Sequence, residues 1–87
     1  MPFLIYSPKF EKRFKNLTLR IKRKLEKRLH LFEINEYEEV LNNHHLQGEY
    51  NGCRSINITS DVRVIYRKLE DGSCYLITIG THSQLYE

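Results

Sequence analysis

The second half of the chain contains three runs in which apolar and polar residues alternate, at residues 53–58, 62–69 and 74–79. Alternation with a period of two places successive side chains on opposite faces of a strand. Short polar connections separate the runs, and Asp71-Gly72 between the last two is a strong signal for a hairpin turn. The pattern predicts a meander of antiparallel strands, so the remaining elements must be organised around this sheet.

The alternation also predicts which face of each strand meets the core. In the run 62–69, Val62, Val64 and Tyr66 share one face, and Arg63 lies on the other. The run 74–79 is apolar on both faces, as expected for a central strand that is covered on both sides. An arginine within a strand needs solvent or an anion, because burying an unpaired charge is costly. Arg63 is therefore a candidate anion-binding residue.

The first half of the chain predicts a short strand followed by two helices. Residues 3–6 are aromatic or branched, which favours a strand. Ser7-Pro8 is a helix start, with serine as the N-cap and proline in the first turn, and this helix is expected to reach about Asn16. From about Thr18 to Glu33, apolar residues recur at helical spacing among lysines and arginines, which predicts a second, amphipathic helix.

The expected architecture is α+β. It is a small antiparallel sheet in the order β-α-α-β-β-β, with the N-terminal helical hairpin packed on one face. Eighty-seven residues suffice for one modest core, and no Gly/Ser-rich linker or repeat divides them, so residues 1–87 are expected to form a single domain. The segment 34–43 is expected to be a short helical turn or an ordered loop, and residues 81–86 an ordered tail.

Positive charge is concentrated in the two predicted helices. Ten lysines and arginines against two glutamates give residues 9–30 a net charge of +8, although the whole chain carries only +3. Such a lobe attracts polyanions, including RNA. A solvated helix face, or a docking surface for an acidic partner protein, has the same charge. Charge alone does not choose among these three interpretations.

Several functional classes are disfavoured by composition. No apolar run approaches the ~20 residues of a membrane span, and no signal peptide is recognisable, so we expect a cytoplasmic protein with no membrane role. Cys53 and Cys74 lack the spacing of metal ligands and are expected to be reduced core thiols. No ligand cluster or motif indicates a metal or another cofactor.

Groups that can transfer protons lie near the ends of the predicted strands. His82 follows the glycine that ends the last strand, and a histidine can act as acid or base near neutral pH, or simply lie on the surface. Asp61 fits a general base and a turn residue equally well. His44 and His45 precede the first long strand, and one of them is a candidate. Tyr86 fits stacking on a base or fixing the end of the chain.

Four motifs together resemble the RelE/ParE toxin superfamily and are most similar to its YafQ-like branch. They are HHLQG at 44–48, GCR at 52–54, DVRVIY at 61–66 and GTHSQLY at 80–86. The resemblance covers the second half of the chain, and the strand–helix–helix start agrees in order and length. It implies a helical hairpin on one face of the sheet and the functional site on the other.

The resemblance also implies a function. Proteins of this branch are toxins of type II toxin–antitoxin systems, which act as ribosome-dependent endoribonucleases (mRNA interferases) and so inhibit translation. The implied partners are mRNA in the ribosome and a cognate antitoxin protein, which is expected on the basic helices or on a sheet edge. The toxin alone is expected to be a monomer that forms a hetero-oligomer with the antitoxin. No cofactor is implied.

Individual positions carry over from the resemblance. His44, Asp61 and His82 fall on catalytic positions of the YafQ-like branch, and Tyr86 falls on its terminal aromatic residue. Arg63 is similar to the arginine with which RelE-like members stabilise a phosphate. The branch often has a further histidine on the first long strand, where this chain has Asn57. Asparagine forms hydrogen bonds but does not exchange a proton.

The implied chemistry is metal-independent acid/base catalysis. The RNA 2′-OH attacks the adjacent phosphorus, Asp61 or His44 accepts its proton, and His82 protonates the leaving 5′ oxygen. Arg63 stabilises the phosphoryl oxygens. The residues expected to bind the substrate are Tyr86, Arg54 and Asn57.

Two alternatives remain at this stage. One is a ParE-like toxin that binds gyrase, and the other is a catalytically degenerate module that binds antitoxin or RNA without cleaving it. The asparagine at position 57 keeps the second alternative open.

Overall fold

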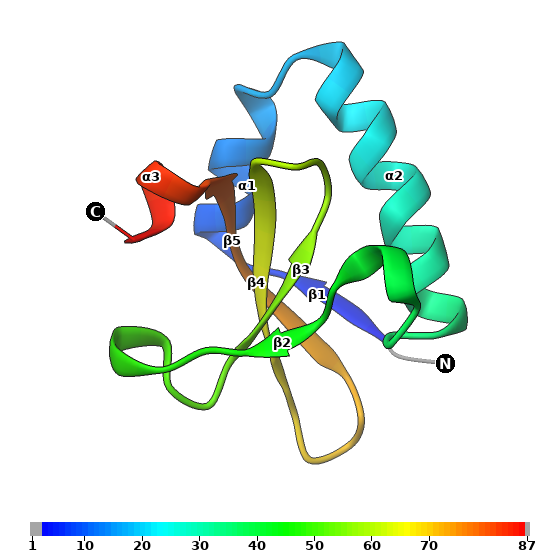
Figure 1. Ribbon diagram of the computed structural model, residues 1–87, viewed down its shortest axis with the longest axis vertical. Coiled ribbons are helices and arrows are strands. Elements are labelled where there is room, and N and C mark those ends of the chain that lie inside the picture. The colour runs from blue at the N-terminus through cyan, green and yellow to red at the C-terminus, as the bar shows by residue number, and fades with distance from the viewer. Residues whose placement is uncertain (1–2, 87) are drawn as a thin grey trace.

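The computed structural model describes residues 3–86, which form a five-stranded sheet with helices on both sides (Figure 1). In chain order the elements are β1 (Leu4–Tyr6), α1 (Pro8–Lys15), α2 (Leu19–Ile34), the 3₁₀ turn η1 (Glu39–Leu41), β2 (His44–His45), the 3₁₀ turn η2 (Gly48–Tyr50), β3 (Arg54–Asn57), β4 (Val62–Lys68), β5 (Cys74–Thr81) and α3 (His82–Tyr86). Among the helices of this part of the chain, none combines the length and apolar character needed to cross a membrane.

The strands lie in the order β1-β5-β4-β3-β2, so β5 is an interior strand with a neighbour on each side, as predicted. The predicted α+β class is confirmed, with a sheet that is mixed and not wholly antiparallel. The pairs β2–β3, β3–β4 and β4–β5 are antiparallel, whereas β1 runs parallel to β5. Parallel neighbours need a long crossover, and here the two helices and the whole meander supply it.

Side-chain caps fix where the two long helices begin. The Ser7 hydroxyl accepts a hydrogen bond from the Phe10 N–H at 2.9 Å, and the Thr18 hydroxyl accepts one from the Ile21 N–H at 3.3 Å. Each cap satisfies an N–H that has no partner within its helix. The predicted helix boundaries are confirmed to within one residue.

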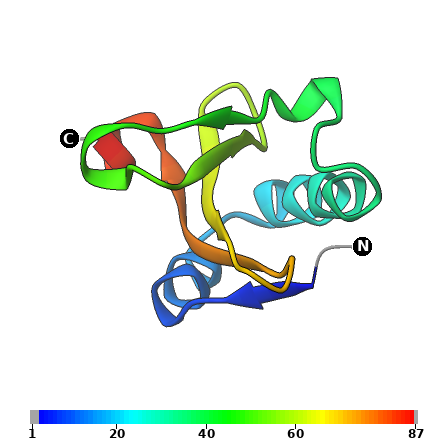
Figure 2. The same cartoon turned by 90° about the horizontal axis from the view of Figure 1, so that it is seen from below.

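Apolar side chains form two clusters, one on each face of the sheet. The larger cluster packs α1 and α2 on the sheet and includes Phe10, Leu25, Phe32, Ile56, Val62, Val64, Tyr66 and Leu76. The smaller cluster on the opposite face consists of Leu46, Cys53, Ile65 and Leu85, with Tyr50 and Ile77 at its margin. Figure 2 places α2 and α3 on opposite sides of the β4–β5 hairpin. The predicted face of Val62, Val64 and Tyr66 is confirmed.

Within residues 81–86, expected to be an ordered tail, residues 82–86 form the short helix α3. Its first turn is closed by reciprocal hydrogen bonds. The Thr81 hydroxyl accepts from the Gln84 N–H at 3.2 Å, and the Gln84 side-chain oxygen accepts from the Thr81 N–H at 2.8 Å. This arrangement is a capping box. Because Leu85 is buried in the smaller cluster, α3 is tied to the sheet at both ends.

Candidate functional site

Two of the predicted site residues lie in one row across the strands, on the face opposite α1 and α2. Asn57 of β3 pairs with Arg63 of β4, and Arg63 pairs with Gly80 of β5. Residues directly opposite each other in antiparallel strands share a face. The neighbouring Val64 points into the larger cluster, so Asn57 and Arg63 point to the other face. The ladder therefore brings the amide of Asn57 and the guanidinium of Arg63 to the same side of the sheet.

Asp61 and His82 flank the last pair of the β4–β5 ladder. That pair is Val62–Thr81, with Asp61 immediately before Val62 and His82 immediately after Thr81. Both side chains are exposed. The two strands thus bring a carboxylate and an imidazole to the same end of the sheet, next to the row that contains Arg63.

The side chain of Arg63 folds over the turn between β3 and β4. Its Nη1 donates to the carbonyl oxygens of Thr59 at 3.3 Å and Ser60 at 3.1 Å. Among the described residues these are its only hydrogen-bond acceptors, although a guanidinium carries five N–H groups. The remaining donors of Arg63 are free to bind an anion.

Aromatic rings stand beside His82. The Tyr86 ring lies 4.8 Å from the His82 ring between centroids, and the Tyr50 ring meets Tyr86 edge-on at 6.2 Å. Burial, followed by the nearby Glu49 carboxylate, raises the pKa of Tyr50, which therefore stays neutral at physiological pH. Tyr50 was not singled out in the sequence, because it belongs to a loop whose position depends on the fold.

His44 lies on the same face as Arg63 but farther across the sheet. It pairs with Ser55, which pairs with Ile65 of the smaller cluster. Two interstrand spacings of about 5 Å separate β2 from β4, so His44 is about 10 Å from the strand that carries Arg63. The His44 Nδ1 lies 2.8 Å from the Asn42 carbonyl oxygen. A carbonyl only accepts, so Nδ1 carries the proton and Nε2 remains as the basic nitrogen.

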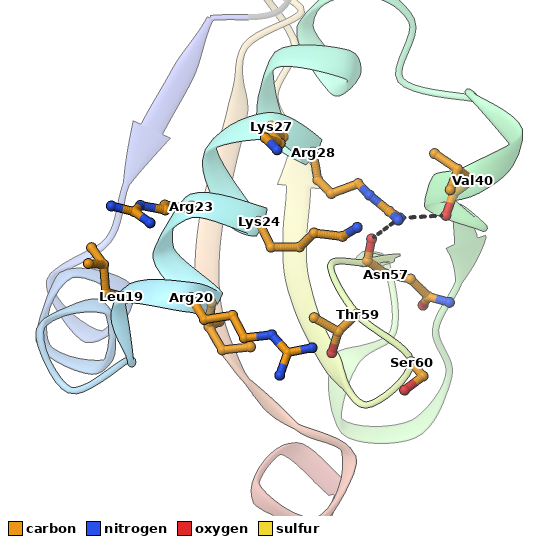
Figure 3. A pocket seen from close by; sticks show the side chains of 11 residues that line it. Leu19, Arg20, Arg23, Lys24, Lys27, Arg28, Val40, Asn57, Thr59 and Ser60 are labelled. Carbon is orange, nitrogen blue, oxygen red and sulfur yellow. Dashed lines mark hydrogen bonds between the residues drawn. The ribbon is translucent and has the colours of Figure 1, made fainter.

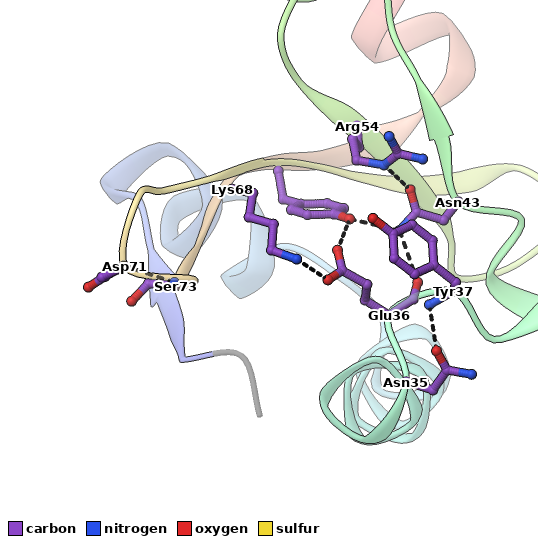
Figure 4. Close-up of polar contacts among 9 residues, drawn as sticks. Asn35, Glu36, Tyr37, Asn43, Arg54, Lys68, Asp71 and Ser73 are labelled. Carbon is purple, nitrogen blue, oxygen red and sulfur yellow. Dashed lines mark hydrogen bonds and ion pairs between the residues drawn. The ribbon is translucent and has the colours of Figure 1, made fainter.

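Arg54 does not join this group. It pairs with Tyr66 and so lies on the α2 face of the sheet. Its Nε donates to the Asn43 side-chain oxygen at 2.6 Å, and its guanidinium stacks over the Tyr37 ring (Figure 4). Asn43 donates to the Tyr66 hydroxyl at 2.7 Å, and that hydroxyl donates to Glu36 at 2.9 Å. Burial raises the pKa of Tyr66, which keeps the hydroxyl a donor. This network holds Arg54 on the face opposite Arg63.

Arg13 of α1 reaches the end of β5 and was missed by the sequence reasoning. Its Nη1 donates to the Ile79 carbonyl oxygen at 3.4 Å. A Cβ on Gly80 would lie 2.7 Å from the same nitrogen, so the glycine makes room for the guanidinium. No sequence signal separates Arg13 from the other basic residues of its helix. Arg13 and Arg63 therefore both lie close to Gly80.

Three buried side-chain oxygens on this face have no hydrogen-bond partner among the described residues. They are Ser55 Oγ, Asn57 Oδ1 and Thr78 Oγ1. Ser55 and Thr78 are both paired with Ile65, and Asn57 is two residues along β3 from Ser55. The face beneath the smaller cluster is thus unusually polar for a buried surface.

The two cysteines lie apart from this chemistry. Cys53 and Cys74 are buried free thiols, as predicted. Burial raises the pKa of Cys74 to about 11, which makes it a poor nucleophile at neutral pH. Within residues 3–86, no three histidine, cysteine or acidic side chains are grouped in a way that could hold a metal ion.

Comparison with known proteins identifies the family and the fold. Residues 4–87 match the family model described as the bacterial toxin of type II toxin–antitoxin system, YafQ. The chain belongs to the YafQ family. A comparison with proteins of curated function gave no significant match.

Solved structures agree with the family. The chain is 26% identical to YafQ from E. coli, with a TM-score of 0.82 and coverage of 100% of both chains. It is 30% identical to the toxin chain of the E. coli DinJ–YafQ toxin–antitoxin complex, with a TM-score of 0.76, over 99% of this chain and 98% of that one. A YoeB/ParE toxin from Agrobacterium tumefaciens is 17% identical with a TM-score of 0.76, over 92% and 98%, and shares the fold.

Proposed function

We propose that this YafQ-family toxin is an endoribonuclease that cleaves mRNA on the ribosome, in the cytoplasm. The observation that carries the proposal is the meeting of Asp61, Arg63 and His82 at one end of the β4–β5 ladder. A base, an acid and a cation around one phosphodiester are what transfer of the phosphoryl group to a neighbouring hydroxyl requires.

The proposed reaction uses the RNA 2′-OH as the nucleophile. Asp61 accepts the 2′ proton while the oxygen bonds to phosphorus. The bond from phosphorus to the 5′ oxygen breaks, and His82 in its protonated form gives that oxygen a proton. The products are a 2′,3′-cyclic phosphate and a 5′-OH, and no oxidant or reductant is needed.

The register favours Asp61 over His44 as the base. Asp61 comes two residues before Arg63 on the same chain segment, whereas His44 is about 10 Å from β4 across the sheet. One phosphodiester does not span that distance. His44 is therefore proposed to contact a neighbouring nucleotide through Nε2, the ring nitrogen that does not face the Asn42 carbonyl.

The remaining groups of the face hold the substrate. The free donors of Arg63 stabilise the phosphoryl oxygens, and Arg13 adds a second positive charge beside Gly80. The rings of Tyr86 and Tyr50 are proposed to stack on bases, which aromatic side chains do without regard to sequence. Asn57 contributes hydrogen bonds beside Arg63.

A cognate antitoxin is the second proposed partner, by analogy with the DinJ–YafQ complex. A groove of about 810 Å³ between α1 and α2 suits a protein segment, because its wall is mainly apolar. The ring of Phe10 lies at its base, and the exposed Leu19 lies at its rim. β1 is an edge strand of the sheet and offers a place for strand addition nearby.

The decisive experiment replaces the proposed acid. His82→Gln is expected to slow mRNA cleavage by translating ribosomes on the order of 10²–10⁴-fold, the usual contribution of a positioned acid or base. Cleavage is measured by mapping 5′ ends on the message. His30→Gln, the same change on the exposed surface of α2, is the matched control and should cleave like the wild type.

Antitoxin binding should be unchanged in the His82→Gln variant, which separates catalysis from partner recognition. Wild-type cleavage by this variant would remove His82 from the mechanism. A wild-type protein that inhibits DNA supercoiling and leaves transcripts intact would replace the proposal with a ParE-like function.

A further inference from the structure

A hollow of about 710 Å³ lies between α2 and the turn that joins β3 to β4 (Figure 3). Its α2 wall contains five cationic side chains, Arg20, Arg23, Lys24, Lys27 and Arg28. No acidic residue lines it. We call this feature the basic hollow. It adjoins the apolar groove between α1 and α2, with which it shares Leu19 and Arg23.

Helical spacing aligns the cations along the hollow. Arg20, Lys24 and Arg28 follow one another at intervals of four residues, which places them in one row on the helix. Figure 3 shows all three side chains extending from α2 toward the β3–β4 turn. A row of positive charges along one helix matches the repeating negative charge of a polynucleotide backbone.

The opposite wall is polar and is fixed by Arg28. The Arg28 Nη1 donates to the carbonyl oxygens of Val40 at 3.0 Å and Asn57 at 3.4 Å, and so links α2 to the end of β3. Thr59 and Ser60 complete this wall. Arg28 thus binds backbone carbonyl groups of the protein itself. Arg20 and Lys24, by contrast, have no hydrogen-bond or ion-pair partner among the described residues.

The apolar groove and the basic hollow differ in the charge of their walls, and this difference indicates what kind of molecule each binds. The apolar groove is lined by the acidic side chains of Glu11, Glu26 and Glu33 as well as by basic ones, a mixture that suits a protein segment. The basic hollow has cations and hydroxyl groups beside Leu19, Ile21 and Val40, and no carboxylate lines it. Its chemistry favours phosphates.

The basic hollow shares a wall with the proposed catalytic edge. The guanidinium of Arg63 is bonded to the carbonyl oxygens of Thr59 and Ser60, the two turn residues that line the hollow. Asp61 follows directly in the chain. An RNA strand that leaves the basic hollow over this turn reaches Asp61 and Arg63 without crossing another helix or strand of the protein.

We infer that the basic hollow binds the phosphate backbone of the RNA strand on one side of the scissile bond. The inference rests on the proposed ribonuclease function for the identity of the strand, but the binding is independent of cleavage. Arg20 and Lys24 are the phosphate ligands, Arg28 fixes the two walls, and the β3–β4 turn leads the strand to the site.

The test measures binding of a fluorescent oligothymidylate, a single strand that has no 2′-OH and is not cleaved. The double variant Arg20→Gln/Lys24→Gln is compared with Lys9→Gln/Lys12→Gln, which removes the same charge from the exposed surface of α1. Each lost phosphate contact lowers the slope of log affinity against log salt by about 0.7. The hollow variant should lose about 1.4 units of slope and about 10- to 30-fold in affinity at 0.1 M salt.

The control variant should lose much less of both. Equal losses in the two variants would show a general charge effect and overturn the inference, as would wild-type binding by the hollow variant. Loss of antitoxin binding with intact oligonucleotide binding would also overturn it, because the hollow would then be a protein site.

The His82→Gln variant separates this inference from the proposed function. It should bind the oligonucleotide like the wild type. If the wild-type protein binds through the hollow but cleaves no message, the proposed nuclease function fails while the hollow remains a polynucleotide site.

Discussion

The two faces of the sheet differ in the size of the apolar cluster that covers them and in their polarity. The face beneath α1 and α2 is packed with large side chains, among which Phe32, Ile56 and Val64 are fully buried. The other face is covered by only four buried apolar residues and hides three oxygens without a partner in the described chain. One face supplies most of the apolar burial on which stability depends, and the other presents polar groups on a support that the first face makes rigid.

This difference predicts that substitutions on one face lower mainly the stability of the fold and that substitutions on the other face change mainly the activity. Changes beneath the helices should unfold the protein, and changes on the opposite face should affect RNA cleavage more than the free energy of unfolding. Three substitutions test this separation.

The largest effect on stability is expected from Phe32→Ala on the helix face. The side chain is fully buried and stacks edge-on against Tyr66 at 4.9 Å between ring centroids. Loss of such a ring costs about 3–5 kcal/mol in the free energy of unfolding, which urea denaturation measures. Ile34→Ala, at the exposed end of the same helix, should change it by less than about 0.5 kcal/mol. Similar values for the two variants would contradict the role of the buried cluster beneath the helices in stability.

A smaller loss of stability but a clear loss of activity is expected from Leu85→Ala. This leucine anchors α3 in the smaller cluster, so its removal should cost about 2 kcal/mol and loosen the helix that begins at His82. RNA cleavage should fall under conditions in which the protein remains folded by circular dichroism. Ser83→Ala on the exposed side of α3 serves as the control. Full activity of folded Leu85→Ala would show that α3 does not position His82.

The smallest effect on stability is expected from Asn57→His on the site face. The substitution places a proton-transferring group beside Arg63, and the free energy of unfolding should change by no more than about 0.5 kcal/mol. Cleavage should rise by up to about 10²-fold, the lower range for a positioned acid or base. Asn57→Gln, which keeps the amide, should show no gain. An inactive histidine variant would mean that Asn57 acts through its hydrogen bonds.

Much of this fold is predictable because the local patterns are strong. Ser7 and Thr18 mark the helix starts, and the alternation at Val62, Val64 and Tyr66 identifies the buried face. The parallel pairing of β1 with β5 is not predictable in the same way. It joins Leu4 to Cys74, and no local signal encodes a partner so distant in the chain.

The site was predictable in part, for the same reason. Arg63 follows from strand alternation, but Arg13 reaches the site only through the packing of α1 beside β5. Arg54 shows the converse, because its residue type suited a phosphate while its register placed it on the other face. The helix α3 carried a readable signal, since Thr81 and Gln84 have the spacing of a capping box.

The pairing of β1 with β5 has a consequence for synthesis on the ribosome. Ser7 donates its hydroxyl hydrogen to the Ile77 carbonyl across seventy residues of sequence. A nascent chain that has released both helices still lacks the strand against which they pack, so their apolar stripes stay open to water until β5 emerges. Such distant contacts form slowly. A newly made toxin is therefore expected to become competent only after translation has passed its last strand.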